Sequence, residues 1–189
     1  MEILRDCRVA VLATDGVEQV ELVEPVRALR EAGAQVSVVS PQKGAIQGMN
    51  HDQPADKIPV DLDLREARSQ QFDALLLPGG VANPDKLRTV PEAIAFVRQF
   101  VTAEKPIAAI CHGPWTLIDA GGVWGKRMTS WPSLRTDLTN GGAAWVDEPV
   151  VKERLLVTSR KPDDIPQFNE AVLELFAVKG GRATLGVIS

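Results

Sequence analysis

The sequence predicts a single α/β sandwich domain built around a mostly parallel central sheet. The chain has 189 residues, which is about the length of one domain. Short apolar, β-rich segments alternate with segments of helical periodicity, a pattern typical of parallel sheets with helices on both faces. The β-rich segments are almost continuously apolar, as expected for strands that are buried on both sides.

Four segments are expected to form parallel strands of this sheet. They are residues 8–13 (RVAVLA), 35–40 (QVSVVS), 73–77 (DALLL) and 106–110 (PIAAI). Two later segments, residues 144–151 and 155–159, are expected to pair in an antiparallel way through residues 152–154.

Helices are expected between these strands. After the first strand, Leu22, Val23, Val26 and Leu29 form an apolar stripe that Gly33 should terminate. Because proline disrupts a helix interior, Pro25 is expected to delay the start of this helix or to kink it. Further helices are expected over residues 91–102, over residues 115–118 with an end at Gly121 and Gly122, and over residues 165–178 after a cap at Asp163 or Asp164.

The remaining segments are expected to be less regular. Residues 41–71 are polar and contain prolines, which predicts a hairpin-like excursion with a short helix near residues 64–69. Residues 179–189 contain three glycines and are expected to be loosely held. The whole chain, residues 1–189, is therefore interpreted as one domain with a core over about residues 8–178.

Composition argues against several classes of protein. The net charge of −4 provides no basic field for nucleic acid or an anionic membrane surface. The N-terminus is charged where a signal peptide would be apolar, and no apolar run approaches the roughly 20 residues that cross a bilayer. Two cysteines are too few for a secreted disulfide framework. We expect a cytoplasmic protein without a nucleic-acid partner, a membrane anchor, a metal or a cofactor.

The most informative stretch is residues 105–115, KPIAAICHGPW, in which an apolar strand leads directly into Cys-His-Gly-Pro. A helix is expected to begin there, and the free N–H groups at a helix N-terminus favour a thiolate over a thiol. A sharp strand-to-helix turn also strains the backbone and presents the side chain at the carboxyl edge of the sheet, where open α/β sheets bind ligands. Cys111 is therefore the candidate nucleophile.

The alternative for such a cysteine is a small buried hydrophobic residue, and local sequence alone leaves it open. Cys7 is expected to be of that structural kind. His112 can serve Cys111 as a base only if the turn is strained, because neighbours on a regular helix point apart. The other histidine, His51, is expected to be a solvated loop residue.

Two further stretches should meet Cys111 at the same edge of the sheet. Residues 72–80, FDALLLPGG, end a strand in Gly79 and Gly80, whose N–H groups are candidates for an oxyanion site together with that of His112; the alternative is an ordinary glycine turn. In residues 14–21, TDGVEQVE, Glu18 is a candidate buried acid with a raised pKa that donates a hydrogen bond to sulfur. The alternative is that Glu18 and Glu21 are ordinary acidic residues at a helix start.

Taken together, these stretches resemble the ThiJ/PfpI superfamily, and within it the PfpI-type intracellular proteases and bacterial general stress proteins. The resemblance covers about residues 8–176. It is carried by ICHGPW, LLLPGG followed by VANPD, VEQVELVEP, TSWPSLRTDLTNGGAAWVD and TSRKPDD. It implies a flavodoxin-like sandwich of the class I glutamine amidotransferase type. Amidotransferase activity itself is not implied, because no histidine follows His112.

The resemblance also implies roles for individual residues. Cys111 would be the nucleophile, His112 its base and Glu18 the acid hydrogen-bonded to sulfur, while Gly79 and Gly80 would line the oxyanion site. Asp85 matches a carboxylate that orients the histidine of a neighbouring subunit, which implies a homodimer or a hexamer of such dimers. Trp131 and Arg160 are candidate pocket residues. Trp131 stands where protease-type members have a tyrosine, and this chain has no tyrosine.

Three functions remain open at this point. The first is a Cys111-dependent stress-protection enzyme that acts on reactive carbonyls or their adducts, of the glyoxalase or deglycase type. The second is an intracellular cysteine peptidase that uses the same residues. The third is a redox sensor or holdase chaperone without turnover, in which Cys111 is oxidised.

Overall fold

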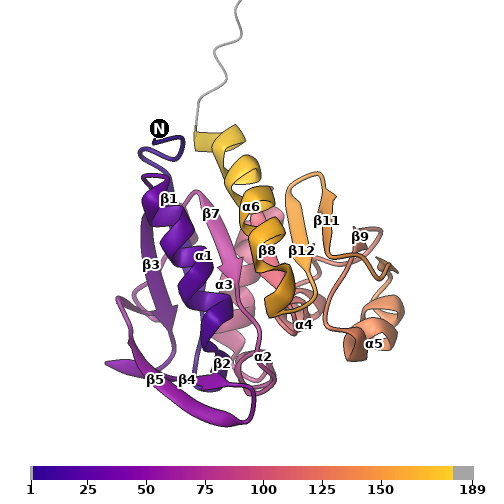
Figure 1. The fold of residues 1–189 in the computed structure, drawn as a ribbon, viewed down its shortest axis with the longest axis horizontal. Helices are drawn as coiled ribbons and strands as arrows, with labels where there is room; N and C mark the ends of the chain where they lie inside the picture. Colours follow the sequence, from indigo (N-terminus) through magenta and orange to yellow (C-terminus); the bar gives the residue numbers. More distant parts are fainter. Residues whose placement is uncertain (1, 181–189) are drawn as a thin grey trace, which may run out of the picture.

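A seven-stranded sheet lies at the centre of the computed structural model, which describes residues 2–180 (Figure 1). In order across the sheet, the strands are β11 (Val150–Glu153), β12 (Leu156–Ser159), β8 (Ile107–Ile110), β7 (Ala74–Leu77), β1 (Arg8–Leu12), β3 (Gln35–Ser40) and β6 (Leu62–Asp63). All neighbouring strands run parallel except β11 and β12, which run antiparallel. The predicted fold class, a single α/β domain with a mostly parallel sheet, is confirmed.

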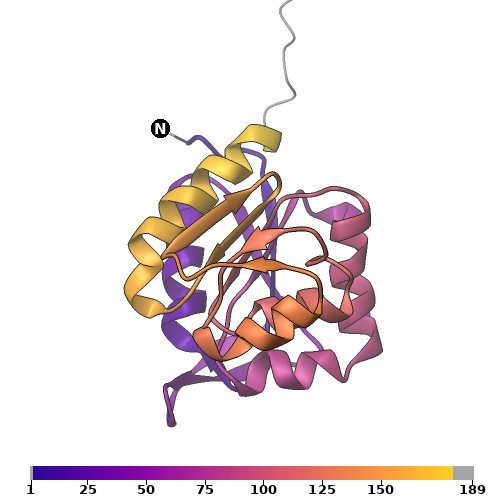
Figure 2. The same ribbon diagram turned by 90° about the vertical axis from the view of Figure 1, so that its right-hand side faces the viewer.

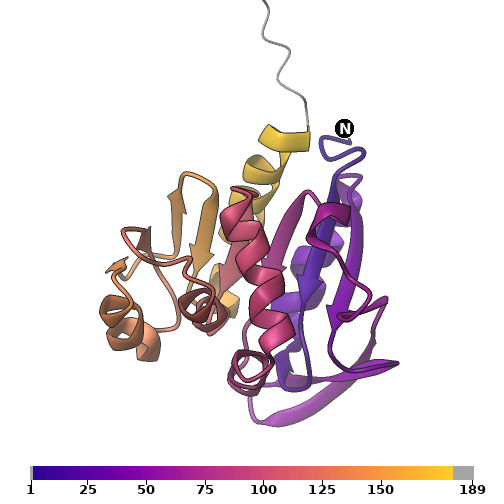
Figure 3. The same ribbon diagram turned by 180° about the vertical axis from the view of Figure 1, so that it is seen from behind.

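Helices cover both faces of the sheet. In Figure 2, α1 (Gln19–Glu31) and α6 (Ile165–Gly180) lie on one side of the strands and α3 (Pro91–Thr102) on the other; Figure 3 shows α3 from its own side. Side chains alternate along β1: Val9 and Val11 pack in the core under α1 and α6, whereas Ala10 and Leu12 pack in the core under α3. This alternation explains why each central strand is apolar throughout.

The four predicted parallel strands, the strand over residues 155–159 and most predicted helices form within one or two residues of their expected limits. The expected late start of the first helix is wrong, because α1 begins at Gln19, ahead of Pro25. A proline inside a helix removes one backbone donor. Of the expected apolar stripe, Val23 is exposed, whereas Leu22, Val26 and Leu29 are buried by that helix. Their burial outweighs the lost hydrogen bond.

The polar stretch before β7 forms the predicted hairpin but not the predicted helix. Strands β4 (Ala45–Asn50) and β5 (Gln53–Pro59) pair antiparallel, and β2 (Val17–Glu18) adds to β4 in parallel. Instead of a helix near residues 64–69, the chain forms one 3₁₀ turn at Ser69–Gln71. The ammonium of Lys105 donates to the carbonyls of Ser69 and Phe72 at the end of this turn.

The segment after Cys111 is divided more finely than expected. Helix α4 (Pro114–Asp119) ends before Gly121 as predicted. The expected strand over residues 144–151 is two strands: β10 (Ala144–Trp145), which pairs with β9 (Arg127–Met128), and β11 in the main sheet. Two short helices, α2 (Ala82–Arg88) and α5 (Arg135–Asn140), were not predicted. Residues 181–189, most of the expected tail, lie outside the described residues.

The carboxyl ends of β1, β7 and β8 meet at one edge of the sheet, and the β4–β5 hairpin lies across that edge at the bottom of Figure 1. This arrangement brings residues 13–19, 78–83 and 111–113 together. None of the helices in residues 2–180 combines the length and the hydrophobicity needed to cross a membrane.

Candidate active site

Cys111 occupies a strained backbone position directly after β8. Its φ is 61°, in the left-handed region that side-chain-bearing residues rarely adopt. Hydrogen bonds on both sides stabilise this conformation: the N–H of Cys111 donates to the Ser159 carbonyl (3.0 Å), and its own carbonyl accepts from the N–H of Trp131 (2.9 Å). Gly113 allows the turn to pass over β7, because a Cβ there would lie 2.3 Å from the Leu77 carbonyl oxygen.

The strained turn directs His112 back toward its own cysteine. Nδ1 of His112 lies 3.2 Å from Sγ of Cys111, and Nε2 lies 3.4 Å from Oγ of Ser133. The ring stacks on Trp131 and meets Trp115 edge-on. Burial lowers the pKa of His112 to about 4, so the imidazole is neutral near pH 7 and one of its ring nitrogens is an acceptor.

The acid beside the thiol is Glu21, which is fully buried. The N–H of Gly79 donates to its Oε2 (3.0 Å). Burial raises the pKa of Glu21 to about 8, although the neighbouring Cys111 thiol and the N–H groups of Gly79 and Gly80 act in the opposite direction. A carboxyl group with this pKa is mostly protonated near neutral pH and can donate a hydrogen bond to sulfur.

The expectation that Glu18 contacts the thiol is therefore corrected to Glu21. Glu18 ends β2, and its Oε2 accepts the backbone N–H of His51 (3.0 Å) instead. Glu21 lies in the first turn of α1 on the face that Pro25 and Leu29 also bury. The signal was present in the sequence, because Glu21 stands four and eight residues before these two apolar residues and so shares their helix face.

Burial and the negative charge of an ionised Glu21 raise the pKa of the Cys111 thiol, and the N–H groups of Gly80 and His112 lower it. The sequence suggested that a helix N-terminus would activate the thiol. That helix, α4, has six residues and starts only at Pro114. The groups that stabilise a thiolate here are therefore the proton on Glu21 and the two N–H groups beside the sulfur.

The two glycines of the Pro-Gly-Gly loop have different roles. The N–H of Gly79 is already bonded to Glu21, so the expected oxyanion role is corrected for this residue. The N–H of Gly80 points to Cys111 and remains a candidate donor for the oxyanion site. Neither position tolerates a side chain: a Cβ on Gly79 would lie 2.6 Å from that of Cys111, and Gly80 has a φ of +77°.

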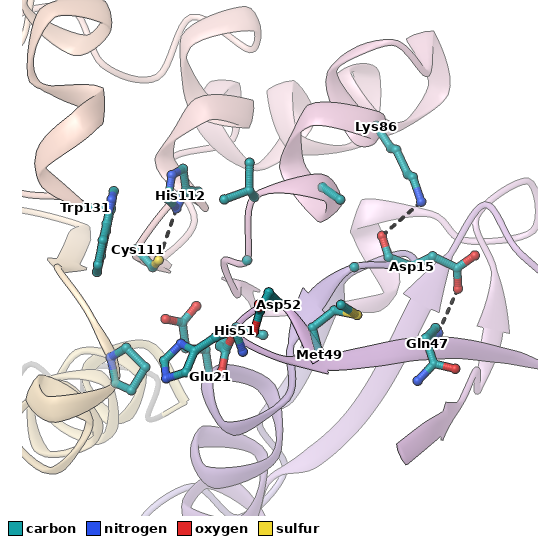
Figure 4. A pocket seen from close by; sticks show the side chains of 16 residues that line it. Asp15, Glu21, Gln47, Met49, His51, Asp52, Lys86, Cys111, His112 and Trp131 are labelled. Atoms are coloured by element: carbon teal, nitrogen blue, oxygen red, sulfur yellow. Dashed lines mark hydrogen bonds between the residues drawn. The ribbon is translucent and has the colours of Figure 1, made fainter. Parts of the chain in front are cut away.

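Cys111 opens into a pocket of about 630 Å³ at the edge of the sheet (Figure 4). Both histidines of the chain line it. His51 lies in the exposed turn between β4 and β5, as expected of a solvated loop residue, and it also borders the pocket. The other lining residues come from the loop after β1, the β4–β5 hairpin, α2 and two later loops: Asp15, Gly16, Glu18, Glu21, Gln47, Met49, Asp52, Gly80, Val81, Ala82, Lys86, Trp131 and Pro162. Trp131 is thus a pocket residue, as expected.

Two other expected site residues lie outside this pocket. The guanidinium of Arg160 donates to Asp147 (2.8 Å) and Asp164 (2.9 Å) and does not line the pocket; Pro162 reaches it instead. Asp85 is exposed on α2, next to the lining residue Lys86. Within residues 2–180, no three His, Cys, Asp or Glu side chains gather as a metal site.

One buried residue of this edge was not anticipated from the sequence. Asn83 accepts a hydrogen bond from the N–H of Thr14 (2.8 Å) and donates to the carbonyls of Pro78 and Gly79 (3.0 Å each). It therefore ties the end of β1 to the Pro-Gly-Gly loop. An asparagine just after a glycine-rich turn resembles an ordinary turn residue, so no local signal marks this role.

The fold and the site together define an α/β protein whose cysteine sits at a strained strand-to-helix turn between a neutral histidine and a buried acid. The comparison with protein families agrees. The chain belongs to the DJ-1/PfpI family, whose model matches residues 7–175. The resemblance to ThiJ/PfpI proteins found in the sequence motifs is confirmed.

Curated relatives match nearly the whole chain. "General stress protein 18" of Bacillus subtilis (strain 168) is 42% identical over 169 residues, covering 89% of this chain and 96% of the relative. "Putative cysteine protease YraA" of the same organism is 40% identical over 168 residues, covering 89% and 97%. "Protein/nucleic acid deglycase 2" of Escherichia coli (strain K12) is 39% identical over 170 residues, covering 89% and 96%.

The fold is also found among solved structures. Drosophila melanogaster DJ-1beta aligns with a TM-score of 0.82 at 30% sequence identity, and the alignment covers 90% of each chain.

Proposed function

We propose that this protein is a cysteine-dependent stress-protection enzyme that acts on reactive carbonyl compounds or their adducts, of the glyoxalase or deglycase type. The observation that carries the proposal is the arrangement around Cys111. A buried thiol lies between a neutral imidazole at 3.2 Å and a buried carboxyl group with a raised pKa. The relatives named as a stress protein and a deglycase support the same function.

The first chemical step follows from these contacts. Nδ1 of His112 takes the thiol proton, and the sulfur of Cys111 attacks the aldehyde carbon. A C–S bond forms, and the π electrons of the carbonyl move to its oxygen. The N–H groups of Gly80 and His112 lie beside the sulfur and stabilise the developing negative charge. The proton held by His112 then passes to this oxygen, and the product of the step is a hemithioacetal.

The second step converts the adduct into a hydroxy acid. With methylglyoxal, a proton moves from the former aldehyde carbon to the neighbouring carbonyl carbon, and the hydroxyl proton of the hemithioacetal moves to the second oxygen. This leaves a lactoyl thioester on Cys111. Water then cleaves the C–S bond and restores the thiol. The sum is methylglyoxal plus water giving lactate, so no oxidant or reductant is consumed. His112 and Glu21 are the groups placed to carry the protons.

We also propose that the working form is a homodimer or a hexamer of dimers, with Asp85 reaching the site of a neighbouring copy. Asp85 is exposed, and the adjacent residues on α2 line the pocket. Among the described residues of one chain, no carboxylate bonds to His112, whose Nε2 lies 3.4 Å from Ser133. A carboxylate from a second chain would complete the orientation of this histidine.

The function is tested by methylglyoxal consumption with lactate detection in a buffer free of amines. Turnover is expected for the wild type and is expected to vanish in Cys111→Ser. Cys7→Ala is the matched control, because Cys7 is a second buried thiol in the core. Its turnover should equal that of the wild type.

Equal rates in wild type and Cys111→Ser, or no turnover in either protein, would overturn the carbonyl reaction. A peptidase, as in the name of one relative, would then be sought by peptide cleavage. Peroxide-dependent client binding without turnover would instead indicate a redox sensor or holdase.

A further inference from the structure

The β4–β5 hairpin forms one wall of the Cys111 pocket, although it lies outside the main sheet. Four of its residues line the pocket: Gln47, Met49, His51 and Asp52. In the view of Figure 4, His51 and His112 lie on opposite sides of Cys111. The pocket therefore contains a second imidazole that the proposed reaction leaves without a role.

The hairpin is fastened to the loop that follows β1. The N–H of Gly16 donates to the Gln47 carbonyl (2.9 Å), and Asp15 accepts the N–H of Gln47 (2.7 Å). Farther along, the side chain of Gln19 exchanges two hydrogen bonds with Asp56 (2.8 and 2.9 Å). This wall is held in place by hydrogen bonds at several points along its length.

His51 stands at the tip of this hairpin in a strained conformation. Its φ is 57°, and its backbone N–H donates to Oε2 of Glu18 (3.0 Å). Glu18 is nearly buried, and its own N–H reaches the Gly79 carbonyl (3.4 Å). Glu18 thus links the hairpin tip to the loop beside Cys111. A left-handed, side-chain-bearing residue at a site is an indication of function when its surroundings hold it there.

The imidazole of His51 is one of the side-chain donors that the pocket leaves available. Lys86 donates to the Asp15 carbonyl (3.4 Å), and the amide of Gln47 donates to the carbonyls of Gly48 and Ala55. Within residues 2–180, the His51 ring makes no hydrogen bond. Of the lining acids, Glu21 faces the sulfur, and the carboxylates of Asp15 and Asp52 offer only acceptors to a substrate oxygen.

We propose that His51 is a substrate-contacting residue, whose imidazole hydrogen-bonds the second oxygen of a substrate with oxygen on two adjacent carbons, and that Glu18 is its positioning residue. This inference rests on the proposed function. The first oxygen, on the attacked carbon, is met by the N–H groups beside the sulfur. The second oxygen has His51 as its donor. The preferred class is α-dicarbonyls and α-hydroxycarbonyl adducts, in contrast to simple aldehydes.

The test measures how well an aldehyde protects Cys111 from alkylation by iodoacetamide, which reports adduct formation even without turnover. Methylglyoxal has two adjacent oxygens and propanal has one. His51→Gly and His51→Asn both remove the imidazole and both tolerate the left-handed backbone. The quantity compared is the aldehyde concentration that halves the rate of alkylation. For methylglyoxal it is expected to rise about tenfold in these variants, and for propanal it is expected to change less than about twofold.

Controls separate this effect from general damage to the site. Alkylation in the absence of aldehyde should stay within about twofold of the wild type in both variants. Gln53→Ala changes an exposed residue of the same hairpin that does not line the pocket, and it should leave protection by both aldehydes unchanged.

The role of Glu18 is tested by a double-mutant cycle. Glu18→Ala should weaken methylglyoxal protection as much as His51→Gly does, and the double variant should be no weaker than either single variant. Glu18→Gln keeps an acceptor for the His51 N–H and should restore most of the protection. Additive losses would overturn the positioning role.

The outcomes distinguish this inference from the proposed function. Unchanged methylglyoxal protection in the His51 variants, or an equal loss for both aldehydes, overturns the inference even if turnover is observed. Protection that depends on His51 without turnover supports the inference and overturns the proposed reaction. A wild type that is neither protected nor active overturns both.

Discussion

At the scale of single residues, the burial of Glu21 makes the stability of the fold depend on pH. Burial raises the pKa of Glu21 to about 8, whereas a glutamate in an unfolded chain titrates near 4.3. Between these two values, the folded chain holds a proton that the unfolded chain has released. The contribution of Glu21 to the free energy of unfolding is therefore most favourable below about pH 4.3, and it is lost as the pH rises through about 8.

Glu21→Gln is expected to remove this dependence, because glutamine resembles the protonated acid and keeps a donor and an acceptor. Relative to the wild type, the variant should gain stability as the pH rises from 4.5 to 8, on the order of 5 kcal/mol over the window. Urea unfolding across this range measures the change. The exposed Glu66→Gln is the control, and stability curves that run parallel for Glu21→Gln and wild type would contradict the prediction.

The contrast between Glu18 and Glu21 shows how residue type alone leaves a choice open. Both are acids three positions apart in the same short motif. The turn from β2 into α1 directs one toward the hairpin and the other beneath the Pro-Gly-Gly loop.

At the scale of elements, Asn83 connects β1, β7 and α2. Its side chain is fully buried and makes three hydrogen bonds to the backbone of the two loops that meet there. A buried backbone group that loses its partner is costly. The loop that carries Gly79 and Gly80 is therefore held in place by a side chain from the following helix.

Asn83→Ala is expected to destabilise the fold by about 2–4 kcal/mol, because one N–H and two carbonyl groups lose their partner at once. The free energy of unfolding in urea checks this, and turnover should fall further as Gly80 loses its position beside Cys111. Glu92→Ala on the exposed side of α3 should change stability by less than about 0.5 kcal/mol. Equal stabilities for the two variants would refute the bridging role.

At the scale of the whole molecule, the proposed role of Asp85 makes each active site depend on two chains. Each copy would supply Cys111 to one site and Asp85 to another. A mixture of Cys111→Ser and Asp85→Asn, each inactive or weak alone, should then recover activity after the subunits exchange, to about a quarter of the wild-type rate for a dimer.

Light scattering after size-exclusion chromatography gives the assembly size, and methylglyoxal turnover of the mixture gives the complementation. A monomer, or a mixture that stays as inactive as its components, would refute the shared site. Asp147→Asn is the control, because Asp147 pairs with Arg160 away from the pocket. A mixture of Asp147→Asn and Cys111→Ser should be no more active than expected from the activity of Asp147→Asn alone.

Much of this fold follows from local sequence. The apolar runs that become β1, β3, β7 and β8 match the observed strands because doubly covered strands need apolar side chains on both faces. The hairpin over residues 45–59 is also local in origin. The helix expected near residues 64–69 does not form; the chain turns at Asp63, whose carboxylate accepts from the backbone and the guanidinium of Arg65.

The sequence by itself determined the strand-to-helix turn at Cys111, with His112 beside it, and the glycine loop at the same edge of the sheet. Only the tertiary structure decided which acid meets the thiol, which glycine N–H is free, and that His51 lines the pocket. The physical reason is the range of the interactions. Periodicity and turn chemistry act between neighbours, whereas burial of Glu21 and the Gly79–Glu21 hydrogen bond join residues 58 positions apart, which only the packed chain brings together.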